Sequence, residues 1–194
     1  MPIAVEVDVM NGKPGFTIVG LADTAIKESR DRVKSALKNS GFPFPRTRVT
    51  ANLAPGNYRK AGTHFDLPLA LGILQNIGAI PRTLNQSCFV MGELCLNGDL
   101  RGVPGVLPLA LGARTAGIQS IIVPDDNANE AAAVSGLIVY SAKSLIQLTN
   151  HLCGKHLLAP HSLITNNNEP AAKTEIDFSV IFGQSEAKRA LEIS

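Results

Sequence analysis

Hydrophobic and polar residues alternate along this chain with two different periods, and each period predicts one kind of element. Near the N-terminus, "IAVEVDV" (3–9) and "GFTIVG" (15–20) have the two-residue period of strands. The turn-forming residues "NGKPG" lie between them, which predicts a β-hairpin. Residues 24–39 have the helical period instead, with apolar side chains on one side and Gly41 just past the end.

The alternation of strands and helices continues to about residue 151. Asp66 stands before an apolar run and is predicted to be its N-cap, and Asn97-Gly98 is a turn signal between two short strands. The other predicted elements are a strand at 48–55, helices at 67–79 and 105–116, a strand at 120–124, a helix at about 127–134, a strand at 137–141 and a helix at 144–151. A β-rich start followed by strand and helix units predicts a layered α/β domain.

Composition changes near residue 158, where a polar stretch with prolines and consecutive asparagines begins. Such a stretch can bury little and is typical of a linker. We therefore expect a domain over 1–158, a linker over 159–174 and a separate segment over 175–194. In that last segment a helix begins near Gln184 and has no capping residue before the sequence ends.

Hydropathy and cysteine usage limit the classes of protein to which the chain can belong. A hydrophobic content of 45% supplies a core, so disorder is excluded for most of the 194 residues. The apolar runs fall well short of the roughly 18 residues of a membrane span, and the start lacks the basic region of a signal peptide. We expect a cytoplasmic protein without membrane contact. Cys88, Cys95 and Cys153 lack CxxC spacing, which predicts reduced, mostly buried thiols.

The net charge of +2 is distributed unevenly. Residues 1–60 hold ten Lys and Arg against five Asp and Glu, whereas residues 61–194 hold eight against eleven. Cations recur every three or four residues along the predicted first helix, beside its apolar side, and a predicted loop adds two more. These candidate contact residues are Lys27, Arg30, Lys34 and Lys38 on the helix and Arg59 and Lys60 on the loop. A solvated helix face is one interpretation, and contact with nucleic-acid phosphates or with an acidic partner is the other.

Motifs for nucleotide and metal binding are missing from the sequence. It has no GxxxxGK[ST] run, so it lacks a P-loop that could hold ATP. The nearest candidates for a metal site are His151, Cys153, His156 and His161. Their spacing fits neither one helix face nor the usual zinc pairs, so we expect no metal there. His64, beside Asp66 at the start of a helix, is expected to be an exposed imidazole.

Three stretches carry a resemblance to a known family. They are "GFTIVGLADTAIKESRDRVKSALKNSGFPFP", "NLAPGNYRKAGTHFDLPLALGIL" and "GELCLNGDLRGVPGVLPLALGAR". Together they resemble the N-terminal domain of the magnesium chelatase-like AAA+ family, in the branch of ComM and YifB. The likeness is collinear to about residue 150 and resumes at "DFSVIFGQSEAKRALEIS". It implies a ribosomal protein S5 domain 2-like fold, shared with the proteolytic domain of Lon, and a chain that begins after the family's first strand and ends before the ATPase core.

The likeness to Lon raises the question of a Ser-Lys peptidase, in which a lysine activates a serine nucleophile. The segment "GVLPLALGAR" is similar to the lysine-bearing segment of Lon and has Leu107 where the lysine would stand. The serine-bearing segment resembles "KAGTHFDLPLAL", with His64 near the serine position and Thr63 beside it. Because neither member of the dyad is present, we expect no peptidase activity and no catalytic residue in this chain.

The family resemblance also implies a role. ComM-like proteins resemble hexameric AAA+ DNA motors that assist branch migration in natural transformation. The present chain would then be a non-catalytic N-terminal accessory domain, with its own ATPase core, further copies in a homo-hexamer and DNA as candidate partners. Two alternatives stay open, namely a regulatory domain of the ATPase subunit of a metal chelatase and an assembly module that does not contact DNA.

The C-terminal segment has its own implied role in that family. Residues Ile181, Gly183 and Gln184 would lie near the nucleotide of the parent protein, to which ATP and Mg²⁺ would bind, whereas this part of the chain would hold no cofactor. Without an ATPase core to pack against, residues 175–194 are expected to be frayed, or to be held only by a neighbouring molecule.

Overall fold

The computed structural model describes residues 2–82, 88–163 and 189. The chain divides into two compact units, Met1–Leu163 and Ile164–Ser194, and the elements named below belong to the first. Most of the predicted linker and C-terminal segment lies outside the described residues, so the boundaries at 158 and 174 stay predictions. Within the first unit His161 is joined to a strand, because its N–H donates to the Val139 carbonyl at 2.7 Å.

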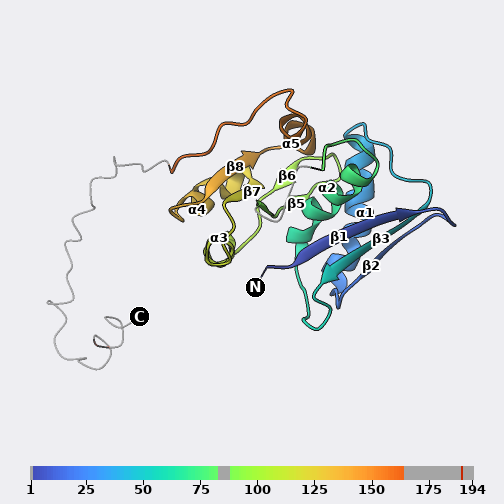
Figure 1. The fold of residues 1–194 in the computed structure, drawn as a ribbon, viewed down its shortest axis with the longest axis horizontal. Helices are drawn as coiled ribbons and strands as arrows, with labels where there is room; N and C mark the ends of the chain where they lie inside the picture. Colours follow the sequence, from blue (N-terminus) through green and yellow to red (C-terminus); the bar gives the residue numbers. More distant parts are fainter. Residues whose placement is uncertain (1, 83–87, 164–188, 190–194) are drawn as a thin grey trace. The chain divides into compact units, whose positions relative to one another are not determined.

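A three-stranded sheet forms the N-terminal part of the first unit (Figure 1). Its strands are β1 (Ala4–Met10), β2 (Gly15–Val19) and β3 (Arg48–Ala54). Their order is β1–β3–β2, with β1 antiparallel and β2 parallel to β3. The predicted hairpin is therefore wrong, because Arg48 pairs with Met10 on one side and with Gly15 on the other. The turn crosses the end of β3, a distance of about 10 Å that four residues span easily.

Two helices pack on one face of this sheet (Figure 1). They are α1 (Thr24–Asn39) and α2 (Asp66–Asn76), the second preceded by the 3₁₀ helix η1 (Thr63–Phe65). Helix α1 connects the parallel neighbours β2 and β3, as a parallel pair requires. It begins after Asp23, whose carboxylate accepts the N–H of Ile26 at 2.8 Å as an N-cap.

A second, parallel sheet has the order β4–β7–β8, and a short antiparallel pair, β5 and β6, flanks the Asn97-Gly98 turn as predicted. The strands are β4 (Cys88–Val90), β5 (Glu93–Leu94), β6 (Leu100–Arg101), β7 (Ser120–Pro124) and β8 (Ile138–Ala142). The helices are α3 (Val106–Thr115), the 3₁₀ helix η2 (Asp125–Asn127), α4 (Ala128–Ala132) and α5 (Leu145–Leu152). The parallel sheet confirms the predicted mixed α/β fold.

Two hydrophobic cores hold these layers together, and β7 contributes to both. Ile122 joins the larger core, which also contains the buried faces of α1, α2 and β3, whereas Ile121 and Val123 join the smaller one with α3 and α4. Burial on both faces is the usual environment of a parallel strand. The outer face of the β1–β3–β2 sheet is solvated instead, with Glu6, Asp8 and other alternate residues exposed. Among the described helices, none is long and apolar enough to cross a membrane.

Candidate functional site

The predicted basic stripe lies on the exposed side of α1. Ile26, Val33 and Leu37 are fully buried on the opposite side, which fixes the rotation of the helix about its axis. The stripe consists of Lys27, Arg30, Lys34 and Lys38, all of which are exposed. At the C-terminal end, Lys38 also lies where a cation stabilises the helix dipole.

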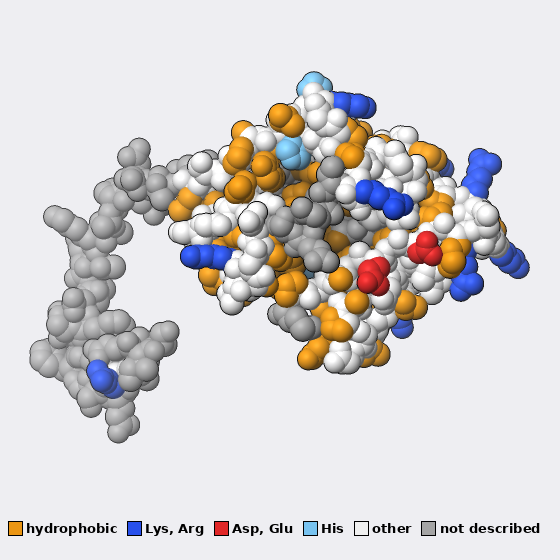
Figure 2. Space-filling view, viewed as in Figure 1, with side chains coloured by type: hydrophobic (Ala, Val, Ile, Leu, Met, Phe, Trp, Pro, Cys, Tyr) orange, Lys and Arg blue, Asp and Glu red, His pale blue; other side chains and the backbone are white. Residues whose placement is uncertain are grey.

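The charge of the stripe is only partly balanced. Asp31 is exposed on the same side, whereas Glu28 lies 3.9 Å from Arg32 and is directed to that residue. Within residues 2–82 and 88–163, no ion pair joins any of the four stripe cations to a carboxylate. On the face drawn in Figure 2, Lys and Arg side chains occur at the end of the domain that contains the β1–β3–β2 sheet, with acidic side chains beside them. The stripe is thus a surface of net positive charge that is free to meet an anionic partner.

The two loop cations differ from each other. Arg59 is exposed, as expected for a contact residue. The expectation of a surface cation at Lys60 is wrong, because Lys60 is only 4% exposed and its Nζ donates to the carbonyl of Pro55. Burial of an ammonium is unfavourable unless it is hydrogen-bonded, so this bond across the base of the loop explains how Lys60 is accommodated.

Asp66 is not the N-cap that the sequence predicts. It is the first residue of α2, with Phe65 at the cap position and no side-chain cap bond. The Asp66 carboxylate is fully buried and receives two hydrogen bonds from Arg32, Nε at 2.7 Å and Nη2 at 3.0 Å. It also accepts the N–H of Leu94 at 3.2 Å, so α1, α2 and β5 meet at one carboxylate. The hydrogen bonds to the Asp66 carboxylate, together with its negative charge, raise the pKa of Arg32, and partial burial opposes that shift.

Sequence reasoning missed this buried ion pair. The available signal was the position of Arg32, which lies out of step with the exposed cations and next to the buried Val33. Nη2 of Arg32 also donates to the Ala25 carbonyl and to Ser29 Oγ, each at 3.1 Å. Because all these partners come from α1 itself or from Asp66, we assign the pair to the positioning of α1, and with it the stripe, on the domain.

The segments that are similar to Lon's dyad regions meet at a hollow of about 540 Å³. His64 and Pro68 contribute to it from η1 and α2, and Leu109 contributes from α3. Among the described residues that line it there is no Ser, Thr, Lys, Asp or Glu. Leu107, at the position expected for the lysine, has its N–H bound to Glu130 Oε1 at 2.8 Å. Cys88 supplies a thiol, but burial raises its pKa, so it stays protonated and is a poor nucleophile.

His64 is half-buried, which corrects the expectation of an exposed imidazole. Its ring lies against Phe65, with centroids 4.3 Å apart. Burial lowers the pKa of His64, and the carboxylates of Asp23 and Asp66 oppose that shift. The imidazole is therefore neutral near pH 7, so one ring nitrogen can donate a hydrogen bond and the other can accept one.

The lowered pKa of His64 predicts a loss of stability on the acid side. Since the folded pKa lies below the ordinary value of 6.5, stabilisation by the neutral ring is full above that pH and is lost as pH falls through the folded pKa. We expect the free energy of unfolding to fall more between about pH 7.5 and about pH 5 in the wild type than in His64→Gln. Denaturant unfolding at both pH values measures this. His151, whose pKa burial also lowers, is present in both proteins and cancels from the comparison. An equal fall in the free energy of unfolding in the two proteins would contradict a lowered pKa of His64.

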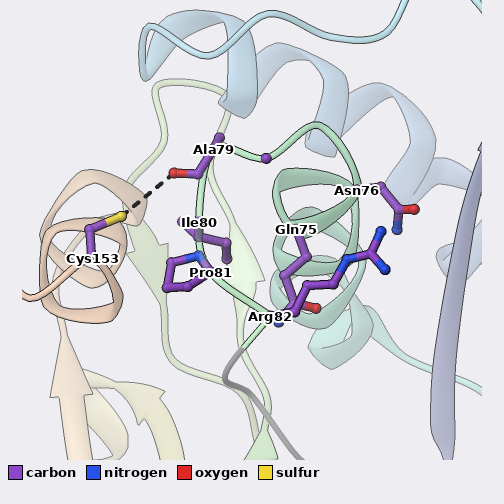
Figure 3. A pocket seen from close by; sticks show the side chains of 8 residues that line it. Gln75, Asn76, Ala79, Ile80, Pro81, Arg82 and Cys153 are labelled. Atoms are coloured by element: carbon purple, nitrogen blue, oxygen red, sulfur yellow. Dashed lines mark hydrogen bonds between the residues drawn. The ribbon is translucent and has the colours of Figure 1, made fainter.

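A second depression of about 600 Å³ lies between the end of α2 and α5 (Figure 3). Gln75, Asn76 and Arg82 lie on one side of it, and Cys153 lies on the other. The Cys153 thiol donates to the Ala79 carbonyl at 3.5 Å (Figure 3). Among the described residues that line it, the depression combines one cation with amides and a thiol, and none of them is a carboxylate or imidazole that could act as a base.

Three of the four candidate metal ligands, His151, Cys153 and His161, have other hydrogen-bond partners. His151 Nδ1 accepts the N–H of Leu158 at 3.0 Å, and His161 Nε2 lies 2.9 Å from Asn129 Oδ1. Over residues 2–82 and 88–163, no group of three His, Cys, Asp or Glu side chains could hold a metal ion. Cys88, Cys95 and Cys153 are free and half-buried, less buried than predicted. The residues assigned to the neighbourhood of a nucleotide, Ile181, Gly183 and Gln184, lie outside the described part of the chain, as does the predicted fraying of 175–194.

Comparison with known proteins identifies the family. The model of subunit ChlI of Mg-chelatase matches residues 5–127. Competence protein ComM of Haemophilus influenzae is 40% identical over 194 residues, which cover 99% of this chain and 38% of that protein. YifB of Salmonella typhimurium is 40% identical over 193 residues, covering 100% of this chain and 37% of that protein. The chain therefore spans less than two-fifths of the length of these relatives.

A more distant likeness supports the fold. Lon protease 2 of Thermus thermophilus is 29% identical over 137 residues, which cover 67% of this chain and 17% of that protein. This agrees with the predicted S5 domain 2-like fold, as in the proteolytic domain of Lon, and with the mixed α/β layers described above. With 123 consecutive positions, residues 5–127, matched by the ChlI model and both ComM and YifB aligned over nearly the whole chain, the chain belongs to the magnesium chelatase-like family.

Proposed function

We propose that this chain is a non-catalytic N-terminal accessory domain of a ComM-like AAA+ ATPase and contacts DNA through the basic stripe of α1. The observation that carries the proposal is the stripe itself, four exposed cations that share one helix side and have no ion-pair partner in the described residues. Similarity to a competence protein supports DNA as the anionic partner. ATP, Mg²⁺, assembly into a hexamer and location in the cytoplasm belong to the proposed parent protein.

The stripe has the dimensions of a phosphate-binding surface. From Lys27 to Lys38 the helix rises about 16 Å, which is comparable with several phosphate spacings along one strand of a duplex. Lysine and arginine on such a helix neutralise phosphates and release counterions, so affinity falls with salt and shows little dependence on base sequence. Asp31 reduces the net charge of the surface but lies among a larger number of cations.

Charge reversal on the stripe tests this proposal. We expect Lys27→Glu, Lys34→Glu and Lys38→Glu together to weaken binding of single-stranded and forked DNA at least tenfold at low salt, and to make log Kd less dependent on log salt by about 1 per lost phosphate contact. Fluorescence anisotropy over a salt series measures both quantities.

A matched control separates the stripe from net charge. Lys13, Arg114 and Lys155 are also exposed, and their replacement by Glu changes the net charge by the same amount. The control variant should keep affinity within about threefold of the wild type. Equal loss in both triple variants would reduce the effect to net charge and would count against a site on α1. Absence of binding by the wild type at low salt would favour an assembly module or the regulatory domain of a chelatase subunit.

The role of the domain in the parent protein needs a separate test. Deletion of residues 1–158 from the full-length protein, followed by measurement of ATPase rate, hexamer formation and DNA unwinding, distinguishes two outcomes. Loss of unwinding alone supports DNA engagement by this domain, whereas loss of all three supports a role in assembly.

A further inference from the structure

The loop that follows β3 is held at its base and exposed at its tip. Its five residues from Pro55 to Arg59 are all exposed. One arm continues β3, and the other returns through Lys60, whose N–H donates to the Leu21 carbonyl at 3.2 Å and whose carbonyl accepts the N–H of Asp23 at 3.1 Å. Since Asp23 is the N-cap of α1, the loop and the N-terminal end of the stripe lie at the same end of the sheet (Figure 1).

Lys60 closes the base of this loop. Its buried Nζ donates to the carbonyl of Pro55, so the ammonium connects the outgoing arm to the returning arm. A second hydrogen bond stabilises the base of the loop, because the Gly62 N–H donates to Asp23 Oδ2 at 3.3 Å. Leu21, which accepts the Lys60 N–H, has a φ of 56°. A left-handed backbone conformation is unfavourable for leucine, so this anchor point is maintained against local strain.

The tip presents an aromatic ring that is more than half exposed. Tyr58 is 53% exposed, and its side chain makes no hydrogen bond or ring contact with the described residues. Arg59, the next residue, is exposed and forms no ion pair in the described part of the chain. The other tyrosine, Tyr140, is half-buried, with its ring centroid 5.0 Å from that of His151.

We propose that Tyr58 stacks on an unpaired base of single-stranded nucleic acid, that Arg59 contacts the adjoining backbone, and that Lys60 is the positioning residue for both. The proposal rests on the proposed contact between α1 and DNA and adds a preference for single strands. Stacking requires the face of a base, which a duplex buries in its own stack, whereas phosphate contact by the stripe is available to both forms. A loop closed by Lys60 holds the ring in place before binding, so less conformational freedom is lost in the complex.

Substitution at Tyr58, with single-stranded and duplex DNA of the same sequence and length compared, tests the proposal. We expect Tyr58→Ala in the 194-residue chain to weaken binding of the single strand about fivefold to a hundredfold, the range found for loss of one stacked base, and to change duplex binding less than twofold. Tyr58→Phe keeps the ring and should bind as the wild type does. Asn57→Ala, an exposed neighbour in the same loop, is the control for general disturbance of the loop.

Lys60 provides the second arm of the experiment. Lys60→Met removes the ammonium but keeps an unbranched side chain, and we expect it to reduce the ratio of single-strand to duplex affinity while thermal unfolding verifies that the domain is folded. Lys60→Arg, which retains a donor, should restore part of that ratio.

Equal losses for both DNA forms in Tyr58→Ala, or no loss for either, would overturn the stacking site and leave the stripe intact. Failure of the wild type to bind either form would instead remove the proposed DNA contact. Capture of a folded protein partner through Tyr58 with no effect on DNA would also contradict the proposal.

Discussion

Replacement of Asp66 by asparagine is expected to lower the free energy of unfolding by about 3–5 kcal/mol, the range for removal of one partner from a buried ion pair. Asp66 is fully buried, and the Arg32 side chain is only 20% exposed. An amide can keep one hydrogen bond but cannot accept both of the bonds from Arg32, so a largely buried guanidinium would lose its counter-charge. Denaturant unfolding followed by circular dichroism measures the change.

Two comparisons make this result specific. Glu28→Gln removes the exposed carboxylate that also approaches Arg32, and its effect should stay below about 1 kcal/mol, as is usual for surface pairs. The double variant Arg32→Met/Asp66→Leu removes both charges and should be less destabilised than Asp66→Asn alone, because no unpaired charge stays buried. If Asp66→Asn and Glu28→Gln had similar small effects, the pair would not be what fixes α1 on the domain.

Gly20→Ala is expected to destabilise the protein by about 3 kcal/mol, by overpacking and an unfavourable backbone conformation together. Gly20 has a φ of 104°, and a Cβ there would lie 2.3 Å from the Leu53 carbonyl oxygen. That oxygen belongs to the backbone of the central strand, so it cannot move aside as the end of a flexible side chain would. Thermal and denaturant unfolding measure the loss.

Gly41→Ala is the matched control for Gly20→Ala. Gly41 also has a positive φ, of 80°, but a Cβ there meets no atom within 4 Å. Its substitution should cost only the left-handed conformation of a residue with a side chain, about 1 kcal/mol. The difference in the loss of stability between the two variants therefore measures the effect of the close approach of Gly20 to β3. Equal losses would mean that this close approach does not affect the free energy of unfolding.

Local pattern predicted the kind of each element better than it predicted the partners of the strands. Helix α1 and strand β7 have the predicted bounds because their periodicity and capping residues are decided within a few residues. The hairpin failed for the opposite reason: the turn residues 11–14 suit a hairpin, but which strand lies beside β1 is decided by residues 48–54, far along the chain. The pairing of strands that are distant in the sequence cannot be deduced from a short stretch of residues.

The candidate site was also predicted only in part, because spacing along the sequence places residues on a helix but not in a loop. Spacing along α1 was sufficient to place Lys27 and its companions on one exposed side, since a helix converts spacing into direction. A loop has no such rule, so Arg59 and Lys60 looked equivalent although one is exposed and the other is buried. The partner of Asp66 is a residue 34 positions away, which propensity for a helix cap could not indicate.

The central position of β3 has a consequence for synthesis of the protein. The strands β1 and β2 precede β3 in the sequence, yet neither pairs with the other, and both form their ladders on residues 48–54. A nascent chain that has emerged only as far as residue 47 therefore holds two strands without a hydrogen-bonding partner, one of them carrying the apolar positions Val5, Val7 and Val9. The N-terminal sheet therefore cannot form until β3 emerges, and α1, which connects β2 and β3 in the sequence, is the element that brings these two strands side by side.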